Sequence, residues 1–62
     1  MIRSEWIQYV VQHPAREVIQ VDGRSIRRWA AIDEMEGRYL RVVLLGDGET
    51  VHNAFFDRSF RP

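Results

Sequence analysis

Hydrophobic residues recur with the period of a helix at the start of this chain and with the period of β-strands afterwards. Near the N-terminus they are spaced three to five residues apart, which places them on one stripe of a helix: Ile2, Trp6, Ile7, Val10 and Val11. Ser4 is suited to cap this helix, Glu5 lies in its first turn, and Pro14 stops it after His13. We therefore expect an amphipathic helix from Ser4 through His13 that packs on another element.

Strand-like runs separated by turn residues fill the rest of the chain. The runs are Glu17 to Val21, Ser25 to Ile32, Tyr39 to Leu45 and Thr50 to Phe56. The turns between them contain Asp22-Gly23, the segment 33–37 and Gly46-Asp47-Gly48, and Asp-Gly between strands is typical of a type I′ hairpin. Because consecutive strands usually pair, the prediction is a single α+β domain over residues 1–62. It consists of one N-terminal helix packed on a four-stranded antiparallel meander sheet, α-β-β-β-β.

Residues two apart in a strand share a face, so the sequence also predicts which side chains lie together. The side chains expected toward the helix are Ile26, Ala30, Ile32, Leu40, Val42 and Leu44. Those expected on the opposite, open face are Arg27, Trp29, Tyr39, Arg41 and Val43.

The last strand allows two registers. Either Val51, Asn53 and Phe55 or His52, Ala54 and Phe56 form the buried set, and a bulge at Phe55-Phe56 would turn both aromatic rings inward. We favour His52 on the open face, although a slip of one residue would exchange it for Asn53. Asn has a poor strand propensity, so Asn53 is expected to make a specific hydrogen bond or to lie at a bulge.

Composition limits the classes of protein. The 62 residues contain no cysteine, which excludes disulfides and thiolate metal sites, and no run is apolar and long enough to span a membrane. A cytoplasmic location is the default expectation. Nine basic and nine acidic residues cancel, so bulk positive potential does not attract nucleic acid. All nine basic residues are arginine, which favours bidentate phosphate or carboxylate contacts, but GC-rich genomes also replace lysine by arginine throughout.

The predicted open face combines cations and aromatic rings with a histidine, which is suited to single-stranded RNA. Metal-free RNA cleavage needs a base, an acid and cationic donors. His52 and Arg41 are the candidate catalytic residues, and the candidate substrate-binding residues are Arg27, Trp29, Tyr39 and Asn53. Pairs of an arginine and an aromatic residue on neighbouring strands also stabilise a solvated sheet face that binds no ligand, so this explanation stays open.

The chain resembles small uncharacterised bacterial proteins in the order of its elements and in two of its strands. One of these strands reads Ile26-Arg27-Arg28-Trp29, and the last reads Val51-His52-Asn53-Ala54-Phe55-Phe56. By element order these are similar to the barnase-like, EndoU-like and RelE-like ribonucleases and to the toxin halves of toxin–antitoxin pairs. The resemblance implies an RNA substrate, an antitoxin-like partner and no metal, with Arg27, Arg41 and His52 binding or cleaving RNA. The neutral charge and the absence of lysine depart from many such toxins.

A non-enzymatic module remains the alternative. It would bind a protein partner or a second copy of itself through the Trp29 and Tyr39 face or through an edge strand, which would add stability to a small domain. Two histidines 39 residues apart predict no metal site, and no cofactor is expected. At the C-terminus, Asp57 and Arg58 are expected to pair with Arg24 or Glu36, and the segment 60–62 to pack as a short tail.

Overall fold

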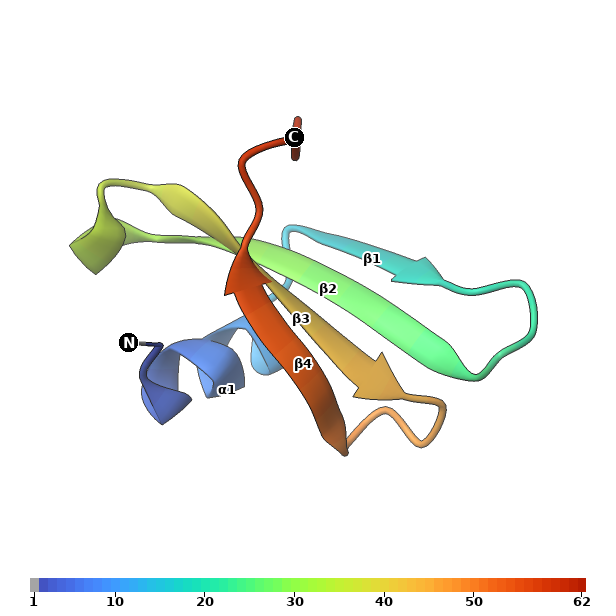
Figure 1. The fold of residues 1–62 in the computed structure, drawn as a ribbon. Coiled ribbons are helices and arrows are strands. Elements are labelled where there is room, and N and C mark those ends of the chain that lie inside the picture. Colours follow the sequence, from blue (N-terminus) through green and yellow to red (C-terminus); the bar gives the residue numbers. More distant parts are fainter. Residues whose placement is uncertain (1) are drawn as a thin grey trace.

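The computed structural model describes residues 2–62 and has the predicted order of elements (Figure 1). Its elements are helix α1 (Ser4–Gln12), strands β1 (Arg16–Ile19), β2 (Ser25–Ile32), β3 (Arg38–Leu45) and β4 (Val51–Phe56), and the short 3₁₀ helix η1 (Asp33–Met35) between β2 and β3. The four strands form one antiparallel sheet in the order β1-β2-β3-β4. The α+β meander prediction is therefore confirmed.

Helix α1 is offset by one residue from the prediction at each end. Arg3 is its N-cap, with extended backbone angles, and its carbonyl accepts the N–H groups of Trp6 at 3.1 Å and Ile7 at 3.3 Å. Ser4 is the first helical residue, so its predicted role as N-cap is wrong. The helix ends at Gln12, and His13 is the C-cap.

The hydrophobic core lies between α1 and one face of the sheet. Its buried side chains come from the helix and the two central strands: Trp6, Val10, Ala30, Ile32, Leu40, Val42 and Leu44. The remaining residues of the helical stripe, Ile2, Ile7 and Val11, pack around this core with Ile26, Met35, Ala54 and Phe56. The predicted apolar stripe and the helix-facing residues of β2 and β3 are therefore confirmed.

Arg28 also lies on the helix side of the sheet, between the core residues of β2. Its guanidinium donates to the backbone carbonyl of Val11 at 3.0 Å and to the Glu17 carboxylate at 2.5 Å. The side chain is 18% exposed, so both contacts are partly shielded from water. Arg28 thus ties the last turn of α1 to strand β1.

The two hairpin turns at one end of the sheet touch each other. Gly23 has φ +69°, whereas Asp22 has no positive φ, so the expected type I′ turn is not formed. A Cβ atom at Gly46 would collide with the carbonyl oxygen of Gly23, which explains the need for glycine there. In the β3–β4 turn, the Thr50 hydroxyl and the backbone N–H groups of Thr50 and Glu49 donate to the Asp47 carboxylate and lower its pKa to about 2.

Candidate functional site

The open face of the sheet, opposite α1, is built from cross-strand rows of side chains. One row crosses all four strands and contains Arg16, Trp29, Arg41 and Phe55. The next row contains Val18, Arg27, Val43 and Asn53, and Tyr39 lies opposite Ala31. The structure thus places the predicted residues Arg27, Trp29, Tyr39 and Arg41 on one face, as expected.

Strand β4 presents Asn53 and Phe55 on the open face, while Ala54 and Phe56 pack against the core on the helix side. Asn53 lies opposite Val43, and its Oδ1 accepts the N–H of Ala54 at 2.8 Å. The expectation that this mid-strand asparagine makes a specific hydrogen bond or lies at a bulge is confirmed, because the register also shifts next to Asn53.

The preference for His52 on the open face is corrected by the register. Val51 and Asn53 pair with consecutive residues of β3, so His52 between them is the extra residue of a β-bulge and is exposed. The bulge lies here and not at Phe55-Phe56. Because His52 is three residues from Phe55, the partner of Arg41, the two candidate catalytic residues are separated by about 10 Å along the strand. The structure does not bring them together.

Arg41 lies in the middle of the open face and is held on several sides. Its guanidinium carbon is 4.8 Å from the centre of the Phe55 ring and 5.9 Å from that of Trp29. Its Nη1 lies 3.7 Å from a carboxylate oxygen of Asp57, and its Nε is buried without a hydrogen-bond partner. With the side chain 23% exposed, Arg41 stabilises this face more than it offers a charge to a ligand.

The C-terminal tail, residues 57–62, covers part of the open face. The Phe60 ring stacks on Trp29 with ring centres 5.0 Å apart and planes at 17°, and it lies 4.8 Å from the centre of the Tyr39 ring. The Arg16 guanidinium lies over the Phe60 ring, with its carbon 5.3 Å from the ring centre. Trp29 is only 7% exposed and is therefore not a free stacking surface for a base, whereas the expected packing of the tail is confirmed.

Asp57 fixes the start of this tail. Its carboxylate accepts hydrogen bonds from the Ser59 hydroxyl at 2.7 Å, the Trp29 indole N–H at 3.0 Å and the Ser59 backbone N–H at 3.0 Å. These donors, together with the charge of Arg41, hold the pKa of the Asp57 carboxyl below its ordinary value. Within residues 2–62, neither Asp57 nor Arg58 forms the ion pairs expected from the sequence.

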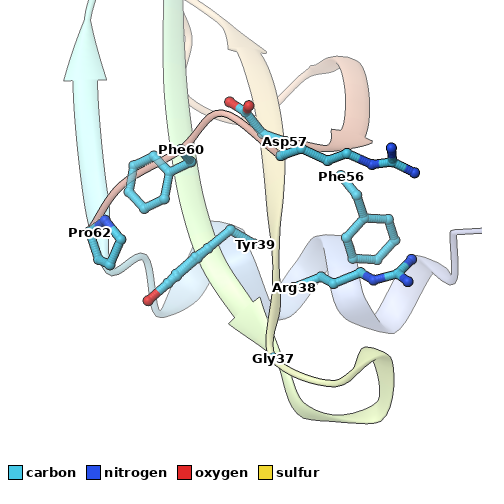
Figure 2. A pocket seen from close by; sticks show the side chains of 8 residues that line it. Gly37, Arg38, Tyr39, Phe56, Asp57, Phe60 and Pro62 are labelled. Atoms are coloured by element: carbon cyan, nitrogen blue, oxygen red, sulfur yellow. The ribbon is translucent and has the colours of Figure 1, made fainter.

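A pocket of about 620 Å³ lies at the end of the sheet where β3 begins and β4 ends (Figure 2). It is lined by Gly37, Arg38, Tyr39, Phe56, Asp57, Arg58, Phe60 and Pro62. Figure 2 shows the Arg38 guanidinium and the Phe56 ring on one side of β3, and the rings of Tyr39, Phe60 and Pro62 on the other. The pocket thus has a cationic side and an aromatic side.

Arg38 and Arg58 differ from Arg41 in having no partner in the described part of the chain. Neither forms a side-chain hydrogen bond or an ion pair among residues 2–62, and both are exposed. Asp57, the one side-chain carboxylate in the lining, is directed away from the Arg38 guanidinium (Figure 2) and accepts hydrogen bonds from Ser59 and Trp29. The positive charge of the pocket is therefore not neutralised from within.

Sequence reasoning missed the pocket arginines and the role of Phe60. Asp57 and Ser59 carry a local signal, because an Asp two residues before a Ser after a strand is typical of an Asx turn. Phe60 is an aromatic residue in an otherwise polar tail, which indicates packing but not its target. Arg38 and Arg58 are 20 residues apart in sequence, and only the sheet brings them to one pocket.

No cluster of three or more metal-ligating side chains occurs among residues 2–62. Over the same residues, no helix has the length and apolar character needed to cross a membrane. Comparison with known proteins gives no match to this chain among family models, curated proteins or solved structures.

Proposed function

We propose that this protein binds single-stranded RNA at the pocket between β3 and the C-terminal tail, without cleaving it. The observation that carries the proposal is a pair of arginines, Arg38 and Arg58, which have no ion-pair partner among residues 2–62 and line a pocket that also contains aromatic rings. Planar guanidinium groups form bidentate contacts with phosphate, and aromatic rings stack on unpaired bases. Arg27 lies opposite Val43 on the open face, away from the pocket, and is not part of the proposed binding site.

Binding without cleavage agrees with the distribution of proton-transfer groups. General acid–base catalysis requires a titratable group within hydrogen-bond reach of the reacting oxygen. Of the pocket residues, Asp57 alone has a carboxylate, and its lowered pKa and its hydrogen bonds to Ser59 and Trp29 make it a poor base. His52 lies at the bulge of β4 and does not line the pocket.

The neutral net charge makes a specific test of this proposal feasible, because bulk attraction contributes little. The test is fluorescence anisotropy of a labelled 12-nucleotide single-stranded RNA across a range of salt concentrations. We expect Arg38→Ala and Arg58→Ala each to weaken binding about tenfold and to reduce the salt slope by roughly 0.7. Arg24→Ala is the matched control, because it removes the same charge from the turn at the other end of the sheet.

Two results would contradict the proposal. Equal losses in all three variants would indicate nonspecific attraction, and binding of an acidic peptide in preference to RNA would identify a protein ligand. Cleavage is tested separately by inducing expression of the wild type and of His52→Ala and examining total RNA. We expect intact RNA in both, and fragmentation that the substitution abolishes would restore the nuclease hypothesis.

Self-association through β1 is the second candidate function, and one observation favours it. This edge strand is exposed along its whole length. Its residues Val18 and Ile19 are 42% and 61% exposed, and Val21 in the following turn is 107% exposed. A second copy pairing with this edge would satisfy its free backbone groups and cover these side chains. Light scattering distinguishes the two states. A dimer that Ile19→Glu converts to a monomer supports the pairing, and a monomeric wild type at high concentration excludes it.

A further inference from the structure

The pocket is closed toward the open face by the C-terminal tail, and this limits what can occupy it. The chain leaves the sheet at Asp57, whose N–H donates to the Tyr39 carbonyl at 2.9 Å. Phe60 then packs against Tyr39 and Trp29, and Arg16 Nη1 donates to the Arg61 carbonyl at 3.4 Å, which ties the end of the tail to β1. A strand that enters the pocket therefore meets the tail and does not continue across the open face.

The size of the pocket matches one nucleotide better than a run of nucleotides. Pockets for small organic ligands measure about 300–1,000 Å³, and this pocket measures about 620 Å³. Its aromatic side, with Tyr39 and Phe60, offers apolar surface for a base, while Arg38 lies on the other side of β3 (Figure 2). A single nucleotide has the same division into a planar base and a charged phosphate.

The charge of the pocket selects the kind of phosphate. Arg38 and Arg58 contribute two positive charges, and no carboxylate within residues 2–62 pairs with either. An internal phosphodiester carries one negative charge, whereas a phosphomonoester carries about −1.5 to −2 at pH 7 and has three terminal oxygens for bidentate contacts. Two guanidinium groups are therefore better matched by a monoester.

We propose that the pocket binds a phosphorylated end of single-stranded RNA, with the terminal phosphomonoester held by Arg38 and Arg58 and the terminal base against Tyr39. This inference rests on the proposed function and adds the part of the RNA that is recognised. A 5′-phosphate and a 3′-phosphate offer the same chemistry to the two arginines, so the experiment has to separate them.

The experiment compares three RNA oligonucleotides of one sequence with an internal fluorophore: one with a 5′-phosphate, one with a 3′-phosphate and one with both ends unphosphorylated. We expect one phosphorylated form to bind the wild type at least tenfold more tightly than the unphosphorylated form. The better form identifies the end that is recognised. Adenosine 5′- or 3′-monophosphate, chosen accordingly, should displace it, whereas adenosine should not.

Variants assign the effect to the pocket. Arg38→Ala and Arg58→Ala should each remove most of the preference for the phosphorylated end, Arg38→Lys should retain part of it, and Arg24→Ala should leave it unchanged. The side chains of Arg38 and Arg58 make no hydrogen bonds within residues 2–62, so the variants should keep the circular dichroism spectrum and melting temperature of the wild type.

The outcomes separate this inference from the function on which it rests. Equal affinity for all three oligonucleotides would overturn end recognition while leaving RNA binding intact. Failure of the wild type to bind any of them would overturn the proposed function itself. A preference for the phosphorylated end that survives in both alanine variants would also overturn the inference, because the charge would then be recognised elsewhere.

Discussion

Replacement of Phe60 by alanine tests whether the C-terminal tail is part of the folded structure. The ring of Phe60 is half-buried, stacks on Trp29 at 5.0 Å between ring centres and lies 4.8 Å from the Tyr39 ring. Removal of a fully buried phenylalanine costs about 3–5 kcal/mol, so half burial predicts roughly half of that loss. The aromatic stacking adds about 0.5–1.5 kcal/mol, which gives an expected destabilisation of about 2–4 kcal/mol.

This loss is large for so small a domain. A core of this size supplies only about 3–5 kcal/mol of net stability, so Phe60→Ala should remove about half of it or more. One kcal/mol shifts the melting temperature of a 60-residue domain by about 4–8 °C, so we expect a decrease of roughly 10–30 °C.

Urea denaturation followed by circular dichroism and by Trp fluorescence measures the effect. Phe60→Leu is the matched control, because it keeps most of the apolar contact and loses the stacking, and it should cost about 1 kcal/mol. A loss below about 0.5 kcal/mol for Phe60→Ala would refute the reasoning. It would mean that the tail leaves the sheet in solution and that the pocket lacks its closed side.

Three further changes test other parts of the structure. Arg28→Ala should lower the free energy of unfolding in urea by about 1–3 kcal/mol, because it removes two charge-assisted hydrogen bonds. Arg27→Ala, on the opposite face, should change it by less than about 0.5 kcal/mol. Equal effects of the two substitutions would contradict the assigned faces. Gly46→Ala should destabilise the protein by about 1–3 kcal/mol, because its Cβ would collide with Gly23, and an unchanged melting temperature would show that the two turns do not touch. The pKa of the Asp57 carboxyl is lowered in the folded state, so the stabilisation that its ionised form gives is present above the unfolded pKa and is lost as the pH falls from about 5 through the folded value. Asp57→Asn should therefore flatten the acidic part of a curve of unfolding free energy against pH. A wild-type curve without a decline in that range would contradict the lowered pKa.

The sequence determined the order and approximate bounds of helix α1 and the four strands, whereas the 3₁₀ helix η1 lies in a segment that was predicted only as a turn. The run Ser25 to Ile32 was predicted with the bounds that β2 has in the structure, and the other elements agree within one or two residues at most ends. The alternation in β2 and β3 also predicted which side chains face the helix. These features depend on residues a few positions apart, whose spacing is visible in the sequence.

Tertiary structure decided the last strand, the open face and the pocket. The register of β4 turns on one extra residue at His52, and either register satisfies the local pattern equally well, so only pairing with β3 and burial of Phe56 choose between them. The contact of Phe60 with Trp29 and the meeting of Arg38 with Arg58 join residues at least 20 positions apart. Such contacts arise from the path of the folded chain and leave no period or motif in the sequence, which is why the candidate site was only partly predicted.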